Sequence, residues 1–366
     1  MNTGSPVLVE FIRSEIRKHG PQSFAWFMQQ ALYHPEHGYY SSGRCAIGRK
    51  GDYFTNVSVG SLFGQLLGAQ FAEIWERLGK IDDIVIVEQG AHDGQFARDV
   101  LQSVQKRAPG FFEALRYRIV EPFPILQQRQ QRTLEGFREK VEWRDSLQPF
   151  VGVHFSNELL DAMPVRLIGD GKEKFVGLDG DKFVFVERPL SQGKDAFNRA
   201  ALDWVDQVAA NLHRGYVIAV DYGHSGDEFQ GNLHVRAQHR HLDSPFDQIG
   251  YADITTHVHW QSIVERAQSN GLRIAGFADQ HHFLTGIVST WPDLLQARPE
   301  NSTALSNQVF NAGVDRRIKR QLQTLLHPEL LGRAFQVIAL EKDSGAPRLA
   351  GFKFGRDPKS ELGLIE

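Results

Sequence analysis

The sequence predicts an α/β fold in which helices cover both faces of a mainly parallel sheet. Short runs rich in β-branched residues alternate with longer stretches of helical periodicity through the middle of the chain. One such run, residues 84–87, passes through a glycine turn directly into a helical stretch. Polar residues also follow the ends of several runs, which is where open parallel sheets bind their ligands.

The N-terminal part is predicted to be helical and then loop-like. Residues 7–18 and 23–33 have helical spacing, with Ser23 as a candidate N-cap of the second helix. Residues 34–60 contain several glycines, basic residues and tyrosines, as functional loops often do. We therefore treat residues 1–60 as a helical extension with a lid loop, and residues 61–366 as the main domain, which opens with an amphipathic helix at 61–78.

The strand-like runs of the main domain lie at residues 84–87, 117–120, 152–156 and 216–220. Helical stretches such as 95–105 and 123–133 separate them, so we expect βα units and a parallel sheet. Between the last two runs, residues 165–190 alternate apolar and polar side chains around two Asp-Gly pairs, which predicts an inserted antiparallel hairpin.

The last part of the main domain is predicted to begin with a loop. This histidine-rich loop runs from Asp221 to about Asp253, and the segment of about 224–260 is expected to build a substrate cleft. A helix at 260–269 and strands at 272–277 and 334–340 follow.

Composition excludes several classes of function. The net charge of −3 and the absence of a dense basic run argue against a nucleic-acid partner. No apolar run reaches 18 residues, so we expect no membrane span. Cys45 is the single cysteine, which excludes an internal disulfide and suits a reducing compartment, so the cytoplasm is the predicted location.

The glycine turn after residues 84–87 predicts a small-ligand site. Glu88 ends the strand, and Gly90 and Gly94 precede the next helix, whose N-terminus favours an anionic group. The spacing differs from the three-glycine fingerprint of dinucleotide sites, because His92 and Asp93 stand inside the turn. A nicotinamide oxidoreductase is therefore disfavoured.

Acidic residues at two further strand ends extend this site. Glu121 closes the second run, where a carboxylate can accept both hydroxyl hydrogen bonds of a ribose; the alternative is an acid that stabilises a helix N-terminus before Pro122. The third run ends in SNELLDAMP, with Asn157, Glu158 and Asp161. A helical turn would place the two acids on one side, ready to hold a cation or take a proton; the alternative is a helix cap with exposed acids.

The fourth run repeats this arrangement, since it ends in Asp221, Tyr222 and Gly223. The fifteen histidines include three closely spaced pairs, at 239 and 241, 257 and 259, and 281 and 282. Without a matching carboxylate spacing they favour packing and solvated roles, so no metal is predicted.

Several segments together resemble one family, the MidA-like S-adenosylmethionine-dependent methyltransferases. They are FMQQALYHPEHGYYSSG, IGRKGDYFT, SLFGQLLG, VEQGAHDGQ, IVEP, FSNELLDAMPVR, VIAVDYGH and DITTHVHW. LYHPEHGYY and NELLDAMPV are the most specific of these. The resemblance implies a Rossmann-like class I methyltransferase fold with a mainly parallel seven-stranded sheet, and S-adenosylmethionine as cofactor.

The resemblance also implies roles for individual residues. The implied cofactor-binding residues are Asp52, Thr55, Glu88, Gly90, Gly94, Glu121 and Asn157, and the implied catalytic residues are Asn157, Glu158 and Asp161. The implied reaction is methyl transfer to an arginine of a partner protein, for example a respiratory-complex subunit. An alternative is a non-catalytic assembly or binding factor, because His92 replaces a family glycine and residues 56–58 replace a family Ser-Pro-Glu. The sequence does not predict the oligomeric state.

Overall fold

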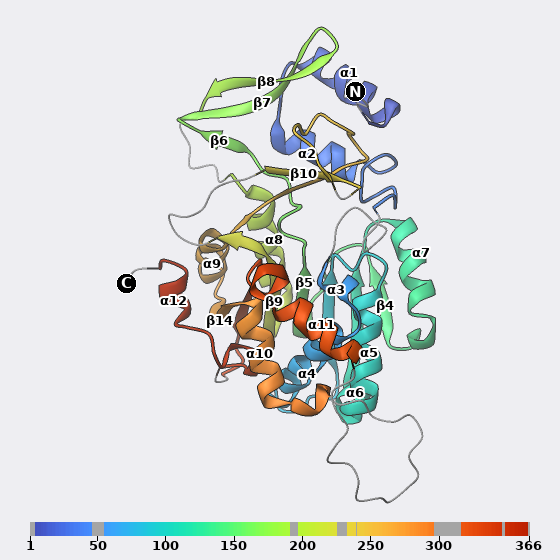
Figure 1. Cartoon of the computed structure of the whole chain (residues 1–366), viewed down its shortest axis with the longest axis vertical. Coiled ribbons are helices and arrows are strands. Elements are labelled where there is room, and N and C mark those ends of the chain that lie inside the picture. Colours follow the sequence, from blue (N-terminus) through green and yellow to red (C-terminus); the bar gives the residue numbers. More distant parts are fainter. Residues whose placement is uncertain are drawn as a thin grey trace, which may run out of the picture.

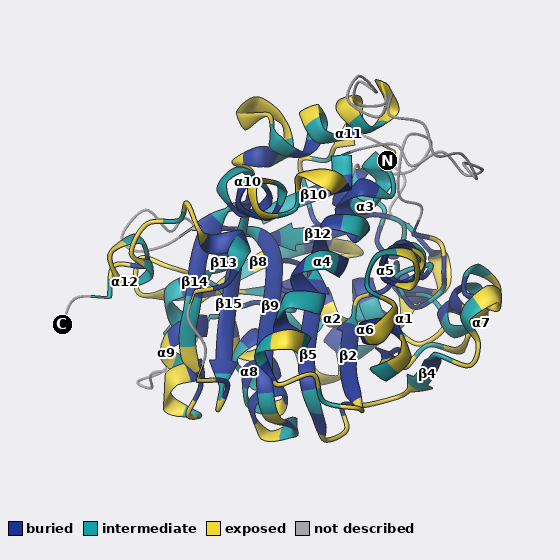
Figure 2. Cartoon of the chain, turned by 90° about the horizontal axis from the view of Figure 1, so that it is seen from below, coloured by how far each residue is buried: buried dark blue, intermediate teal, exposed yellow. Residues whose placement is uncertain are grey.

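The structure is a computed structural model that describes residues 4–45, 55–190, 197–224, 233–238, 240–295, 316–345 and 348–364. Among them, the central sheet has eight strands, seven of which lie in the order β14-β15-β9-β5-β2-β3-β4 (Figure 2). Their bounds are β2 (Ile84–Gln89), β3 (Leu115–Val120), β4 (Val141–Arg144), β5 (Phe150–Asn157), β9 (Leu212–His224), β14 (Arg273–Asp279) and β15 (Phe335–Lys342). The two-residue strand β13 (Val258–His259) also pairs with the end of β9.

Most of this sheet is parallel. Strands β4, β3, β2, β5 and β9 run in one direction, whereas β15 lies antiparallel between β9 and β14. The predicted mainly parallel sheet is therefore confirmed, and it has eight strands rather than the predicted seven because β13 pairs with the end of β9. The four strand-like runs of the sequence all lie in this sheet, and the predicted strands near 272–277 and 334–340 are β14 and β15.

Alternation along the strands explains why helices cover both faces. In β2, Ile84 and Ile86 enter one hydrophobic core, while Val85 and Val87 enter the other. The first core packs against α4 (Leu62–Arg77), α5 (Gln95–Arg107), α6 (Pro109–Ala114), α10 (Gln280–Thr290) and α11 (Arg316–Leu326). The second packs against α8 (Arg199–Asn211) and α9 (Trp260–Ser269), and Leu362, which follows α12 (Pro358–Glu361), also enters it. In Figure 2 the buried strands lie between helices whose outer faces are exposed.

The N-terminal helices form as the sequence predicts. They are α1 (Pro6–His19) and α2 (Phe24–Tyr33), and the Ser23 hydroxyl caps α2 by accepting from the Trp26 N–H at 3.2 Å. The predicted hairpin is also confirmed, as β7 (Lys172–Asp179) and β8 (Lys182–Pro189). Two short strands extend its sheet, β6 (Leu167–Gly169) and β1 (Gln22–Ser23).

The predicted loop between Asp221 and Asp253 is partly wrong. A second small sheet occupies this region, with β10 (Leu233–Ala237) between β11 (Arg240–His241) and β12 (Asp253–Thr256). These strands are two to five residues long; β10 pairs with β11, which follows it closely, and with β12, at registers such as Leu233 with Thr256. Short strands of this kind leave little periodicity in a local sequence window.

A third core joins the N-terminal helices to these two small sheets. It contains apolar side chains of α1, α2, β7, β8, β10 and β12, and Figure 1 shows these elements grouped at one end of the molecule. This smaller unit contacts the polypeptide that follows β5: the Thr256 N–H donates to the Asp161 carbonyl at 2.8 Å, and the Tyr33 hydroxyl donates to the Ala162 carbonyl at 3.1 Å. The division at residue 60 stays a prediction.

Two further helices complete the site region. They are α3 (Asn56–Val59), which precedes α4, and α7 (Pro124–Thr133), which follows β3. Among the described residues, no helix combines the length and apolar character that crossing a lipid bilayer requires.

Candidate active site

The loop between β2 and α5 has an unusual backbone at three alternating positions. Gly90, His92 and Gly94 have φ angles of 82°, 47° and 80°, in the region that favours glycine. A side chain at Gly94 would also meet the α7 backbone, since its Cβ would lie 3.3 Å from the Gln130 Cα. The two glycines therefore shape a tight turn at the N-terminus of α5, as the sequence predicts.

His92 keeps this backbone conformation although it is not glycine. Its carbonyl accepts from the Gln130 side-chain amide at 3.0 Å, and its ring Nε2 lies 3.3 Å from the Cys45 carbonyl. Burial lowers the pKa of His92, but hydrogen bonds with Asp93 and Cys45 outweigh it and raise that pKa to about 10. The His92 ring therefore contacts the backbone of Cys45.

Acidic side chains stand at the ends of two adjacent strands. Glu88 is the second-last residue of β2, is buried, and accepts from the Tyr117 hydroxyl of β3 at 2.6 Å. Glu121 follows β3, and its two carboxylate oxygens accept from the Phe123 N–H at 3.1 Å and the Gln130 amide at 3.0 Å. Burial raises the pKa of Glu88 to about 8 and that of Glu121 to about 7.

The polypeptide after β5 wraps around the Asp221 carboxylate. One oxygen of Asp221 accepts from the backbone N–H groups of Leu159, Leu160 and Asp161 at 2.8–3.3 Å, and the other accepts from the Tyr222 N–H at 2.8 Å. Asp221 is only 1% exposed, so hydrogen bonds to this buried carboxylate determine the conformation of the loop that follows β5.

The predicted helical turn at Glu158 and Asp161 is therefore wrong. The N–H groups that a helix would use bind Asp221 instead, and Glu158 has a φ of 54°. The two acids nevertheless interact, because the charge of Glu158 helps raise the pKa of Asp161, after burial, Asp221 and Asp253. Asp161 is buried, which argues against the alternative of exposed capping acids.

Two residues of the smaller unit, Tyr40 and Asp253, complete a cluster of carboxylates. Asp253 begins β12 and accepts from the Tyr40 hydroxyl at 2.6 Å; the Tyr40 ring stacks on Tyr33 with centroids 5.6 Å apart. We did not predict either residue for the site, although Tyr40 lies in LYHPEHGYY and Asp253 in DITTHVHW. Within the described part of the chain, no lysine or arginine pairs with Glu158, Asp161 or Asp221.

The remaining predicted residues lie on α3 and before it. Thr55 is buried and caps α3, with its hydroxyl accepting from the Ser58 N–H at 3.2 Å. Asn157 ends β5, and its side-chain oxygen accepts from the Asn56 amide of α3. Asp52 lies outside the described residues. The structure brings the other predicted residues to one edge of the sheet, and their individual roles stay predictions.

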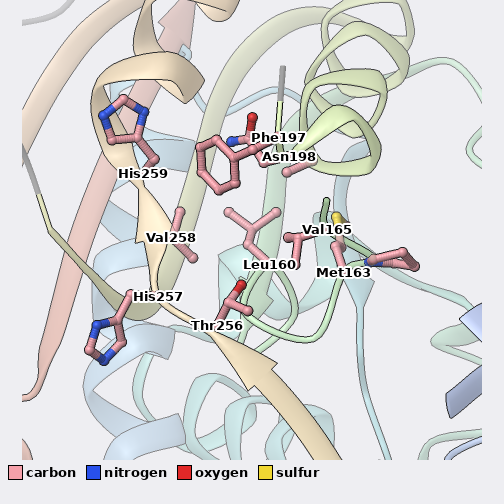
Figure 3. A pocket seen from close by; sticks show the side chains of 11 residues that line it. Leu160, Met163, Val165, Phe197, Asn198, Thr256, His257, Val258 and His259 are labelled. Atoms are coloured by element: carbon pink, nitrogen blue, oxygen red, sulfur yellow. The ribbon is translucent and has the colours of Figure 1, made fainter. Parts of the chain in front are cut away.

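A small pocket lies beside this cluster. Figure 3 shows it between Leu160 and Val165 after β5, Phe197 before α8, and Thr256 to His259. Its volume of about 10 Å³ corresponds to a single water molecule, so it has no room for an amino-acid side chain. In the described ranges, no group of three or more His, Cys, Asp or Glu side chains is arranged to hold a metal ion.

Comparison with known proteins gives consistent matches. A family model described as a putative S-adenosyl-L-methionine-dependent methyltransferase matches residues 66–278. The Drosophila melanogaster protein named protein arginine methyltransferase NDUFAF7 homolog, mitochondrial, is 25% identical, over 92% of this chain and 85% of its own. Its human counterpart is 26% identical, over 98% of this chain and 88% of its own.

Solved structures agree with these sequence matches. A likely methyl transferase from Burkholderia thailandensis, bound to S-adenosyl-homocysteine, superposes with a TM-score of 0.83 and 29% identity over 97% of this chain and 96% of that chain. A native crystal structure of an uncharacterized protein from the same organism gives 0.80 and 28%, with the same coverage.

Proposed function

We infer the function from the family, because this chain belongs to the putative S-adenosyl-L-methionine-dependent methyltransferases, and we propose that its methyl acceptor is an arginine of a partner protein. The chain is thus a methyltransferase with S-adenosylmethionine as cofactor. The observation that carries the arginine proposal is the group of carboxylates that follows β5 and includes Asp221 of β9 and Asp253 at the start of β12, with Glu158 and Asp161 at its centre.

The residues at the sheet edge fit the cofactor. Glu121 is the proposed acceptor for ribose hydroxyls at the end of β3, and the Gln130 amide links that acid to the His92 carbonyl of the glycine turn. The buried Oδ1 of Asn56 has no partner among the described residues, so the site keeps an acceptor for an N–H donor. Bound S-adenosylmethionine supplies a methyl group on a sulfonium, so no covalent intermediate on the protein is required.

An arginine guanidinium fits the carboxylates for two reasons. It is protonated at neutral pH, so it neutralises acidic side chains that burial and mutual repulsion hold at raised pKa. It is also planar, so two carboxylates can fix its orientation relative to the methyl donor. The relatives named as protein arginine methyltransferases support this acceptor.

The proposed reaction needs one proton acceptor. A new N–CH₃ bond forms as the S–CH₃ bond breaks, the sulfur keeps the electron pair, and one N–H proton leaves the nitrogen. Glu158 is the proposed acceptor: burial raises the pKa of its carboxyl to about 8, close to neutral pH, and the positive charge of a bound guanidinium would favour the carboxylate form that accepts the proton.

The test combines labelled S-adenosylmethionine with extract from the organism that makes this chain, followed by identification of the modified residue by mass spectrometry. Labelled arginine supports the proposal, and labelled lysine as the sole product contradicts it. Glu158→Gln is expected to lower kcat by about 10²–10⁴-fold while S-adenosyl-homocysteine affinity stays within about threefold. Unchanged transfer by this variant would remove Glu158 from the mechanism.

A matched control is Glu187→Gln. It changes the same functional group on the exposed strand β8, where Glu187 pairs with Lys172 at 2.8 Å, and should leave methyl transfer unchanged. A non-catalytic assembly factor would instead bind S-adenosyl-homocysteine and transfer no methyl group with the wild-type chain.

Partner and location remain proposals. A respiratory-complex subunit is the proposed substrate, from the family resemblance, and identification of the labelled protein in the same experiment tests it. The single cysteine supports the cytoplasm as the compartment, whereas the printed names of the relatives describe those proteins as mitochondrial. Cell fractionation with detection of this chain tests the location.

A further inference from the structure

A chain of amide hydrogen bonds joins α3 to Glu158. The Asn56 Nδ2 donates to the Asn157 Oδ1 at 3.0 Å, and the Asn157 Nδ2 donates to the Glu158 Oε1 at 2.8 Å. The backbone N–H of Asn56 also lowers the pKa of Glu158 and so favours its carboxylate. The Asn56 side chain reaches Glu158 through Asn157.

The Asn56 side chain is not needed to form α3. Thr55 and Ser58 cap this four-residue helix through a reciprocal pair of hydrogen bonds that does not involve the Asn56 amide. Asn56 is 0% exposed, and its Oδ1 has no partner among the described residues. Burying an amide oxygen in this way is unfavourable, so an asparagine here needs a compensating role.

An amide carries a donor on one side and an acceptor on the other. The contact made by one side of Asn157 therefore decides which group its other side presents. If the amide were turned over, its oxygen would face the Glu158 carboxylate and repel it. The N–H that Asn56 directs at the Asn157 oxygen selects the orientation in which Asn157 donates to Glu158.

We propose that Asn56 is a positioning residue of the methyl transfer reaction: it fixes the Asn157 amide so that Asn157 donates to Glu158 and favours its carboxylate, the form that accepts the proton. The kinetic importance of this role rests on the function proposed above, whereas the contact itself does not.

The surroundings of Glu158 make this contact matter. Asp161 lies on the same loop, Asp221 and Tyr222 come from β9, and Asp253 comes from β12. Burial and the charges of Asp221 and Asp253 oppose ionisation of Glu158, while the Asn157 amide and the Asn56 N–H favour it. Loss of the amide orientation should therefore make the carboxylate a weaker acid.

The test is a ¹³C NMR titration of the whole chain labelled at glutamate Cδ, without cofactor, with Glu158→Gln to identify the signal. Asn56→Ala should raise the Glu158 pKa by about one unit, a tenfold change in its ionisation equilibrium. In an Asn157→Ala background, Asn56→Ala should add less than about 0.3 unit, the margin expected when one residue acts through the other. If the alanine variant does not fold, Asn56→Leu removes the donor and keeps the volume.

Ser58→Ala is the matched control, since it removes the Ser58 hydroxyl from the reciprocal cap of α3 and keeps both asparagines. Its Glu158 titration should equal that of the wild type. An unchanged titration in Asn56→Ala, an equal shift in Ser58→Ala, or a full shift in the Asn157→Ala background would each overturn the proposal. Because the titration needs no methyl acceptor, these outcomes are independent of whether arginine is the substrate.

Discussion

Gln130 of α7 connects three parts of the site that are distant in the sequence. Its Nε2 donates to the Glu121 carboxylate and to the His92 carbonyl, both at 3.0 Å, and its Oε1 accepts from the Trp143 indole of β4 at 3.0 Å. It is 0% exposed. A buried amide with three partners fixes the glycine turn relative to the acid at the end of β3.

His92 allows the turn to be tested at a single residue. Its φ of 47° suits glycine, and the turn-forming contact uses its backbone carbonyl rather than its ring. His92→Gly should therefore fold and keep S-adenosyl-homocysteine affinity within about threefold, because glycine adopts this φ without strain. Isothermal titration calorimetry measures that affinity.

His92→Val provides the comparison for this prediction. A β-branched residue in the left-handed region should cost about 1–2 kcal/mol of stability and weaken binding. If His92→Gly instead lost more than about tenfold in affinity, a loss of more than about 1.4 kcal/mol, the imidazole ring itself would contribute to cofactor binding.

At the scale of elements, the sequence predicts what depends on local pattern. The glycine turn, the strands of the central sheet and the hairpin at 165–190 have clear periodicity or turn chemistry, and all are present. The loop around Asp221 could not be predicted, because its three N–H groups bind a carboxylate about sixty residues away rather than a local carbonyl. Tyr40 and Asp253 meet for the same reason, through packing of the smaller unit against the sheet edge.

Residues of the smaller unit contact the site, so a substitution in α2 that destabilises this unit should affect methyl transfer. Phe27 is fully buried in the third core, with its ring 5.4 Å from Phe246 and 6.2 Å from Phe183. Phe27→Ala should destabilise this unit by about 3–5 kcal/mol through the cavity it leaves. Since Tyr33 and Tyr40 belong to this unit, methyl transfer should fall more than S-adenosyl-homocysteine affinity.

Hydrogen exchange separates the two units in this experiment. In Phe27→Ala, amides of α2 and β7 should lose protection, while those of β2 and β5 keep it. Phe71→Ala, a fully buried phenylalanine of the first core on α4, is the control, and it should weaken cofactor binding as well. Equal loss of protection in both units of Phe27→Ala would contradict this division of roles.

At the scale of the whole molecule, buried acids with raised pKa values should shape the dependence of stability on pH. The carboxyls of Glu88 and Glu158 titrate at about 8 in the folded chain because burial opposes their ionisation. Histidines with lowered pKa values act in the opposite sense. Burial lowers the pKa of His154 to about 3, so this residue increases the free energy of unfolding as pH rises toward the ordinary histidine pKa of 6.5. Above pH 6.5 that contribution is complete and constant.

The interval from pH 6.5 to 8 therefore isolates the groups that bind protons more tightly when folded. Glu88 and Glu158 keep protons there that the unfolded chain has already released, and His92, with its pKa raised to about 10, acts in the same direction. Since the folded state then binds more protons than the unfolded state, the free energy of unfolding must fall as pH rises, by about 1–2 kcal/mol for each of these three groups across this interval. Urea unfolding of the ligand-free chain at several pH values measures this fall.

Glu88→Gln should flatten the curve because the amide does not titrate, whereas Glu187→Gln on the exposed strand β8 should not. A stability that stays level or rises between pH 6.5 and 8 would mean that the carboxylates at the sheet edge are already ionised in the folded chain.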